Sequence, residues 1–522
     1  MAGKVLILGA GLAGIAAAHA AAAAGAEVEI ASRRVGLGSN SAMANTMFTA
    51  PLGGYPLDAY VADTIAIGKD LNLPWMVRLV GREAPASLEA LAPLGLNLRA
   101  HGPTLILDSL RQDQIKGQLM MSALAKAIRR QPGVTVREGF HAREIVLAEG
   151  RAVGAAGWDH TGAWQVLRAD AVILALGGAG AVYARNDNVR SILGQGYLLA
   201  ARAGLPLHDL EFVQFYPLIL DEPGLPSLLM YPNYPPQARV LGPDGEDVLA
   251  AIGVSDLNEG ILKHRDSLSA SLYEVCRRGK VTLDYTGVPD ELWETYPLAA
   301  LARLKFDFRQ KPVGVSPGAH FCMGGVAVDQ AYATARPGLF AAGEVVWGLH
   351  GANRRGGNAM TECVVSGRLA GEAAASLAGS AGPAPAASPA APELAPAGAG
   401  SQPDGRELLA RLRTIAWDRA GVVRDAAGLI AGLAEINALE AEVLTWRAAG
   451  VGPLRQRDDL LAGALAVKGI LTASRARTES RGSFLRSDHP DPAPAPPQNS
   501  ALVWQPADRS FRVSLAPAPT EP

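Results

Sequence analysis

The chain has 522 residues, of which 49% are hydrophobic and 19% are charged, and its formal net charge is -2 at pH 7. This length predicts two or three domains, and the composition is typical of a globular protein rather than a disordered one. The nearly balanced charge predicts no surface for nucleic acid or for anionic membranes.

Three cysteines, Cys276, Cys322 and Cys363, lie far apart in the sequence and form no CxxC pair. We therefore expect no disulfide framework, and no iron–sulfur or zinc site supplied by this chain. The first four residues lead directly into a strand whose apolar continuation is broken by glycines. This pattern predicts neither a signal peptide nor a transmembrane helix, so we expect a cytoplasmic protein that reaches a membrane only through a partner.

The chain begins with a pattern typical of a βαβ unit. Residues 4–9 predict a buried strand, the sequence GAGLAG and an alanine-rich helix follow, and residues 27–32 predict a second strand. In a dinucleotide fingerprint Gly9 makes the turn, Gly11 lets the backbone approach a pyrophosphate, and Gly14 lets the helix pack closely on the strand. Because these glycines lie between a strand and a helix, they predict a dinucleotide-binding site.

The second strand ends in Ser32, Arg33 and Arg34, where an acidic residue usually binds a ribose. Arginines at this position could hold the 2′-phosphate of NADP, which leaves a nicotinamide cofactor as an alternative. Residues 38–45, with the sequence GSNSAMAN, are small and polar and suit a backbone that passes beside an extended cofactor. This segment weakens the nicotinamide alternative.

Residues 55–130 are expected to be helical. Further strands are predicted at residues 134–137, 144–147, 152–158, 164–167 and 170–176, and the last of them ends in Gly177 and Gly178. A βαβ unit, a long insertion, a meander and a returning strand with Gly-Gly are the layout of an FAD domain of the two-dinucleotide-binding type.

Residues 337–371 contain a predicted strand at 338–342, the loop HGANRRGGN and a helix with small residues on one side. The free N–H groups and the dipole of the helix N-terminus favour an electron-rich or anionic group. Loops of this kind commonly close over the ring end of a flavin.

We expect an α/β fold, with a Rossmann-like FAD domain, an inserted α+β capping domain and a C-terminal helical bundle. The predicted parts are an FAD-binding domain at 1–216 and 316–377, a capping domain at 217–315, a Pro/Ala-rich linker at 378–404, a helical domain at 405–490 and a Pro-rich tail with one short strand at 491–522.

Several motifs occur in a fixed order: GAGLAG, ALGG at 175–178, EFVQFYP at 211–217, Arg265-Asp266, HFCMGG at 320–325, HGANRRGGN and ESRG at 479–482. Together, from residue 4 to about residue 490, they resemble the flavoprotein subunits of the succinate dehydrogenase/fumarate reductase family, which includes L-aspartate oxidase. The resemblance implies that FAD is bound by Gly9, Gly11, Gly14, Ser32, Arg33, Ser39, Asn40, Ser41, Ala44, Asn45, Ala142, Ala175, Gly177, Gly178, Glu344, Asn358, Ala359 and Met360.

The same resemblance bears on the kind of cofactor. The family has Ser-Lys where this chain has Ser32-Arg33, which favours FAD over NADP. Membrane-bound members attach FAD through a histidine, whereas this chain has Asn40 at that position. The resemblance therefore implies non-covalent FAD and no metal in this chain.

The resemblance also implies three catalytic residues. Arg265 aligns with the arginine that transfers a proton to one carbon of a C=C bond while hydride passes between flavin N5 and the other carbon. His320 and Arg354 align with the pair that holds a substrate carboxylate, and an arginine fork suits a planar carboxylate. From local sequence, Arg265 could equally be a solvated residue at a helix start and His320 a core histidine.

Some positions differ from the family pattern. The second carboxylate site of the family uses a histidine and a threonine where this chain has Tyr216 and Leu218. Tyr231 and its neighbours replace another part of that site, Tyr234 lies near the place of the relay arginine, and Thr46-Met47 replaces a Gly-Gly pair. We therefore assign Thr46, Tyr216 and Tyr231 to a reshaped substrate pocket, although these tyrosines could be ordinary core aromatics of the cap and another residue could supply the second clamp.

A pocket with one carboxylate clamp predicts an enoate or acyl substrate with one carboxyl group and a bulky apolar remainder. The expected partners are a small carboxylate substrate and an iron–sulfur electron-transfer subunit. Two alternatives stay open at this point. One is an enzyme like L-aspartate oxidase that acts on a C–N bond, and the other is a non-catalytic FAD-bearing protein that relays electrons in a larger complex.

Overall fold

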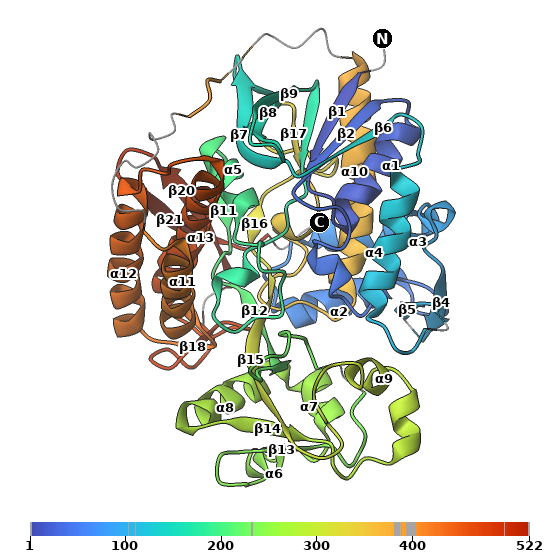
Figure 1. The fold of residues 1–522 in the computed structure, drawn as a ribbon, viewed down its shortest axis with the longest axis vertical. Coiled ribbons are helices and arrows are strands. Elements are labelled where there is room, and N and C mark those ends of the chain that lie inside the picture. Colours follow the sequence, from blue (N-terminus) through green and yellow to red (C-terminus); the bar gives the residue numbers. More distant parts are fainter. Residues whose placement is uncertain are drawn as a thin grey trace.

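The structure is a computed structural model that describes residues 3–102, 104–109, 111–230, 233–380, 387, 389–392, 403–494 and 496–519. Figure 1 shows the capping unit at the bottom, the C-terminal helices at the left, and the N-terminal α/β unit above and to the right. In these described residues no helix is both long and apolar enough to cross a membrane.

A five-stranded parallel sheet forms the centre of the α/β unit. Its order is β17-β10-β1-β2-β6, with bounds Leu339–Ala341, Ala171–Leu174, Lys4–Leu8, Glu27–Ser32 and Val134–Glu138. The apolar side chains of β1 and β10 are fully buried, as expected for a parallel sheet that is covered on both faces. The expected α/β fold is confirmed.

Helices α1 (Leu12–Ala23) and α10 (Asn358–Ser380) lie side by side against this sheet (Figure 1). Two glycines of α10 allow the close approach. A Cβ atom at Gly367 or Gly371 would lie 2.4 Å from the carbonyl oxygen of Ala13 or Ala17, respectively. The small-residue face of α10 therefore brings the loop that precedes this helix close to the N-terminus of α1.

Between β2 and β6 the chain forms three helices and a small antiparallel sheet. The helices are α2 (Leu57–Gly68), α3 (Pro74–Glu89) and α4 (Lys116–Ile128), and the sheet has the order β3-β5-β4, with bounds Met47–Thr49, Thr104–Leu107 and Leu98–His101. The expectation that residues 55–130 are helical is thus wrong at β4 and β5. The sequence of β5, Thr-Leu-Ile-Leu, suits a strand, and Gly102 makes the turn before it with a φ of 58°.

After β6 come the meander β7 (His141–Ala148), β8 (Arg151–Trp158) and β9 (Trp164–Arg168), and, beyond β10, helix α5 (Gln195–Arg202). The capping unit has an antiparallel sheet of order β12-β15-β14-β13, with bounds Val213–Leu220, Val313–Cys322, Val281–Asp284 and Arg239–Leu241. Its helices are α6 (Val248–Ala251), α7 (Leu257–Lys263), α8 (Arg265–Arg278) and α9 (Leu298–Leu301). Because β12 and β15 run across both expected boundaries of the cap, the domain division stays a prediction.

The C-terminal part contains the helices α11 (Gly405–Ala420), α12 (Ala426–Thr445) and α13 (Val451–Ala476), and a short parallel pair, β18 (Val423–Arg424) and β19 (Leu485–Arg486). Most of the expected linker lies outside the described residues. The expected tail with one short strand is wrong, because the hairpin β20 (Gln498–Gln505) and β21 (Ser510–Pro517) joins β11 (Leu207–His208) and β16 (Gly325–Val326) in one sheet. The prolines before residue 498 obscured the two-residue alternation in Phe511-Arg512-Val513-Ser514-Leu515.

Candidate functional site

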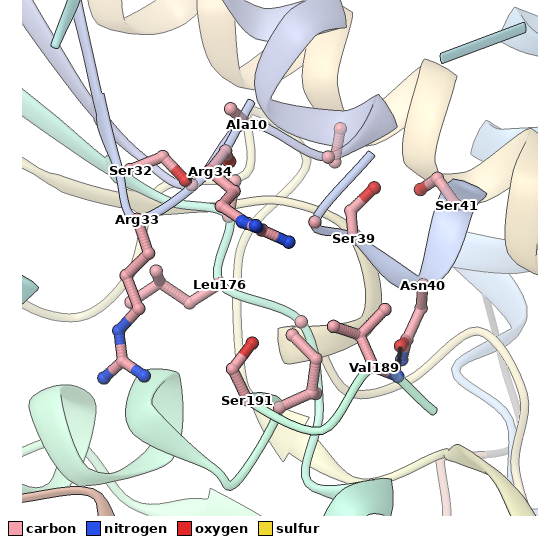
Figure 2. A pocket seen from close by; sticks show the side chains of 18 of the residues that line it. Ala10, Ser32, Arg33, Arg34, Ser39, Asn40, Ser41, Leu176, Val189 and Ser191 are labelled. Carbon is pink, nitrogen blue, oxygen red and sulfur yellow. Dashed lines mark hydrogen bonds between the residues drawn. The ribbon is translucent and has the colours of Figure 1, made fainter. Parts of the chain in front are cut away.

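A cavity of about 540 Å³ opens where β1 meets α1. Figure 2 shows its wall, to which the end of β2, the segment around Ser39 and the loop around Ser191 contribute. Eleven predicted cofactor residues line this cavity: Gly9, Gly11, Ser32, Arg33, Ser39, Asn40, Ser41, Ala142, Ala175, Gly177 and Glu344. We call it the dinucleotide cavity.

The glycines at its floor fit a bound pyrophosphate. Gly9 has a φ of 111°, and a Cβ atom there would lie 2.1 Å from the carbonyl oxygen of Ala175. At Gly11 the nearest atom to an added Cβ is 3.4 Å away, so the backbone there is crowded by no neighbour and faces the cavity. The N-terminus of α1 lies at the same place, and its dipole favours an anionic group.

The two arginines after β2 have different surroundings. Arg33 donates to Oδ2 of Asp459 on α13 at 3.0 Å and to Nε2 of His141 at 3.1 Å. Burial lowers the pKa of His141 to about 3, so this ring is neutral and accepts. In Figure 2 the side chain of Arg34 points toward Ser39, while that of Arg33 points away from it. Sequence reasoning named Arg33 and not Arg34 as a residue that binds FAD.

A second cavity, of about 250 Å³, adjoins the first, since Asn40, Ser41, Glu344 and Cys363 line both. We call it the substrate cavity. It brings together the three predicted catalytic residues and two of the predicted pocket residues, Arg265, His320, Arg354, Thr46 and Tyr216. The predicted cofactor residues Ala44, Asn45, Ala359 and Met360 also line it.

His320 and Arg354 are held by buried partners. Nδ1 of His320 lies 2.7 Å from Oδ2 of Asp187, a buried carboxylate that accepts a hydrogen bond from the ring N–H. Nε of Arg354 donates to Oε1 of Gln214 at 3.1 Å, and its guanidinium stacks 4.9 Å from the centre of the Phe321 ring. These contacts fix the two side chains before any ligand arrives, as carboxylate binding requires.

Arg265 begins helix α8 and is joined to the same loop as Arg354. Its Nη2 donates to Oδ1 of Asn353 and, at 3.1 Å, to the carbonyl oxygen of Arg354. The amide of Asn353 in turn donates to Asp266. The loop HGANRRGGN therefore positions both arginines of the substrate cavity.

Burial shifts the pKa values of two charged groups in the cavity. Burial, with the charge of Arg265 as a second cause, lowers the pKa of Arg354 to about 9. Burial also raises the pKa of Glu344 to about 7, against the hydrogen bonds that its carboxylate accepts from the backbone of Cys322 and Gly178. An anion beside Arg354 would relieve part of the cost of burying its charge.

Three of the predicted site residues that the structure describes, Gly14, Gly178 and Asn358, line neither cavity. A Cβ atom at Gly14 would lie 2.1 Å from the carbonyl oxygen of Gly9, so this glycine serves helix packing. Gly178 holds Glu344 through its backbone, and Asn358 is buried with its Nδ2 3.3 Å from Oγ1 of Thr64. Tyr231 lies outside the described residues.

Sequence reasoning missed Asp187, Gln214 and Asn353 as site residues. Gln214 lies inside the motif EFVQFYP and Asn353 inside HGANRRGGN, and Nε2 of Gln214 donates to Oδ1 of Asn353 at 3.0 Å. The motifs could have pointed to both residues. Asp187 belongs to no motif that we identified, so no comparable signal was available for it.

Comparison with known proteins gives the family. Residues 4–360 match the model of an FAD binding domain, and residues 409–521 match that of a fumarate reductase flavoprotein C-terminal domain. The chain is 35% identical to an L-aspartate oxidase of Caulobacter vibrioides over 93% of both chains. It is 29% identical to one of the subunits of a fumarate reductase (CoM/CoB) of Methanothermobacter marburgensis, over 84% of each chain.

Among solved structures, a quinol-fumarate reductase with menaquinol molecules superposes with a TM-score of 0.86 at 25% identity. The match covers 100% of this chain and 99% of the other. The resemblance inferred from the motifs is thereby confirmed, and so is FAD as the cofactor. The chain belongs to the succinate dehydrogenase/fumarate reductase flavoprotein family, which includes L-aspartate oxidase, and is an FAD-dependent oxidoreductase.

Proposed function

We propose that this protein reduces or forms a C=C bond next to the carboxyl group of a substrate that carries one carboxylate and an apolar remainder. The observation that supports this proposal is the mixed lining of the substrate cavity, which combines basic and apolar side chains. Among the described residues, its basic lining side chains are Arg265, His320 and Arg354, and apolar side chains of Met43, Leu229, Ile261 and Leu262 line it as well.

In this proposal Arg354 and His320 bind the carboxylate, and Asp187 keeps the imidazole oriented. A buried arginine that is already fixed by Gln214 loses little freedom on binding, and its fork can donate two parallel hydrogen bonds. The two residues also stabilise negative charge that develops beside the reacting carbon. Bound FAD supplies or accepts the hydride.

Arg265 moves the proton. Its Nη2 donates to Asn353 and to the carbonyl oxygen of Arg354, and its Nε lies 3.7 Å from Oδ1 of Asp266. Among the described residues this leaves Nη1 as the nitrogen of Arg265 that is available to a substrate. Arg265 is mostly buried, with 16% of its side chain exposed.

Tyr216 stands where the family's second carboxylate clamp has a histidine. Its ring centre lies 5.9 Å from that of His320, and its hydroxyl interacts with Tyr234. A tyrosine at this point carries no positive charge to compensate a second buried carboxylate. For this reason we propose that fumarate and succinate are not the preferred substrates.

A second candidate function is oxidation of the C–N bond of an amino acid, as in L-aspartate oxidase. The similarity to the Caulobacter enzyme over 93% of both chains favours it. The absence of a cationic partner for the side-chain carboxylate, among the described residues of the cavity, counts against aspartate itself.

The test is anaerobic reoxidation of the reduced protein by fumarate, acrylate, crotonate, cinnamate or oxygen. A parallel sample of oxidised protein receives L-aspartate. Fast reoxidation by a monocarboxylate and not by fumarate is the expected result. Reoxidation by fumarate contradicts the reshaped pocket, reduction by L-aspartate selects the second candidate, and no response to any compound selects a protein that only relays electrons.

The Arg265→Lys variant tests whether Arg265 transfers the proton. Turnover of the active compound should be lost while the flavin spectrum is kept. The matched control is Arg277→Lys on the same helix, whose side chain is 68% exposed and outside both cavities. Full activity of Arg265→Lys contradicts the proton-transfer role.

We propose two further features of the complete enzyme. An electron-transfer subunit, of the iron–sulfur type, exchanges electrons with the flavin, in keeping with the relative whose name makes it one subunit of a larger fumarate reductase. FAD is bound non-covalently, because Asn40 has no nucleophilic nitrogen to attach it. Acid precipitation of the protein should release all flavin into the supernatant, and flavin that stays with the pellet contradicts this.

A further inference from the structure

Thr46 has an unusual backbone conformation. It precedes strand β3 with a φ of 55°, in the left-handed region that β-branched residues rarely adopt. Its side chain is fully buried. Such conformations cost free energy and are concentrated at functional sites, where the surrounding structure holds them in place.

The hydroxyl of Thr46 is also unusual. It is buried and has no hydrogen-bond partner among the described residues. Thr49, three residues further along, is buried as well, but its hydroxyl donates to the carbonyl oxygen of Gly356 at 2.9 Å. A buried hydroxyl without a partner is costly, so the contrast between these two threonines calls for an explanation.

The position of Thr46 supplies one. Thr46 lines the substrate cavity together with Arg265, His320 and Arg354, and it does not line the dinucleotide cavity. We infer that Thr46 is a substrate-binding residue, whose hydroxyl donates a hydrogen bond to a carboxylate or carbonyl oxygen of the bound substrate.

This inference rests on the proposed function and extends it. A carboxylate has more acceptor sites than the two donors of an arginine fork can fill. Arg354 and His320 supply N–H donors, and Thr46 adds a hydroxyl donor that carries no charge into the cavity. A neutral hydroxyl selects for an oxygen acceptor without attracting a second carboxylate.

The experiment compares the FAD-loaded protein with its Thr46→Val and Thr46→Ser variants. Valine has nearly the same shape and lacks the hydroxyl, whereas serine keeps it. The probes are crotonate and L-aspartate, and binding is measured as the dissociation constant from flavin absorbance and as the rise in unfolding temperature on adding each probe.

For Thr46→Val we expect two changes of opposite sign. Without a probe, its unfolding temperature should rise by a degree or more, because a buried hydroxyl without a partner has been removed. Its dissociation constant for the better probe should rise about tenfold, as for loss of a hydrogen bond to a charged group. Thr46→Ser should stay within about threefold of the unchanged protein. The stability control is Thr49→Val, which loses the hydrogen bond to Gly356 and should unfold at a lower temperature.

The outcomes separate this inference from the proposed function. Equal affinity of Thr46→Val and the unchanged protein overturns the inference alone. A changed flavin spectrum or potential in Thr46→Val, with probe affinity unchanged, assigns the hydroxyl to the flavin and overturns it too. If Thr46→Val binds the better probe tenfold more weakly but the unchanged protein turns over neither probe, the proposed function alone is overturned. If the unchanged protein binds neither probe, both the inference and the proposed function are overturned.

Discussion

The carboxylate of Asp187 accepts a hydrogen bond from Nδ1 of His320 across 2.7 Å, although the two residues are 133 positions apart in the sequence. Asp187 is 7% exposed, so the pair lies largely out of water, where such a bond is strong. It fixes the imidazole with Nε2 toward the substrate cavity, where a substrate carboxylate would bind.

The variant Asp187→Asn tests this relationship. The amide accepts with one oxygen and carries no charge, so it orients His320 less firmly than the carboxylate does. We expect kcat/KM for the best carboxylate substrate to fall about 10- to 100-fold, mainly through KM. The matched control is Asp221→Asn, which removes a half-exposed partner of Arg185 and should leave kcat/KM within about twofold. An unchanged KM in Asp187→Asn contradicts the role of the pair.

The C-terminal helices contribute to cofactor binding through Asp459. This residue of α13 pairs with Arg33, which lines the dinucleotide cavity, and its carboxylate accepts a hydrogen bond from Nε2 of Gln195 at 3.0 Å. In the Asp459→Asn variant Arg33 loses its ionic partner and the wall of the cavity is less ordered. Because both side chains are partly exposed, we expect only a modest rise of the dissociation constant for FAD, up to about fivefold.

The measurement is a fluorescence titration of the flavin-free protein with FAD. Glu442→Gln is the control, since this residue pairs with Arg411 on the surface of the same helical unit and lies away from both cavities. An equal rise in both variants would assign the effect to the stability of the helices. An unchanged dissociation constant for FAD in Asp459→Asn would show that cofactor binding does not depend on the ion pair between Arg33 and Asp459.

Much of the central fold could be predicted from the sequence. Continuous apolar runs identified β1, β2 and β10 to within two residues of each end, because strands buried on both faces leave no polar positions to confuse the pattern. Short strands such as β4 and β5 carry a weaker signal, because four residues hold at most two periods of alternation.

The site could be predicted only where the sequence keeps a motif. Arg265, His320 and Arg354 belong to three separate motifs, and the structure brings them into one cavity. The partners Asp187 and Asp459 could not be predicted, because an ion pair across 133 or 426 positions depends on the tertiary fold. The positive φ of Thr46 could not be predicted from this sequence either. The only hint was that the family has a glycine at this position.

Leu262 tests the apolar part of the substrate. It is 76% exposed and yet lines the substrate cavity, so it stands at the mouth of this cavity beside Ile261. A substrate with a long apolar remainder would cover it, and a short one would not reach it. In Leu262→Gln we expect kcat/KM to fall about fivefold for cinnamate, which corresponds to about 1 kcal/mol of lost apolar burial, and to stay unchanged for crotonate.

The control for Leu262 is Ile430→Gln. Ile430 on α12 is 55% exposed and lines neither cavity. Its replacement should therefore leave kcat/KM unchanged for both cinnamate and crotonate. Equal losses for cinnamate and crotonate in Leu262→Gln would mean that the residue supports the fold of the cap rather than the substrate.

Glu344 makes stability depend on pH. Burial raises its pKa from 4.5 to about 7, so the folded protein keeps a proton that the unfolded chain releases. This contribution to stability is complete below pH 4.5 and is lost as the pH rises to 7. The pH-dependent contribution of Glu344 to the free energy of unfolding is at most about 3 kcal/mol. The Glu344→Gln variant lacks this pH dependence, because its amide has no proton to lose in this range.

The measurement is the unfolding temperature of both proteins at saturating FAD from pH 5 to pH 8. Glu344→Gln loses one acceptor oxygen for Cys322 or Gly178, and this cost is the same at every pH, so the diagnostic quantity is the difference between the two proteins and not its value at one pH. That difference should shift in favour of Glu344→Gln by several degrees between pH 5 and pH 8. A difference that is constant with pH would mean that Glu344 is ionised throughout this range, held by the backbone donors and by Asn40 despite its burial.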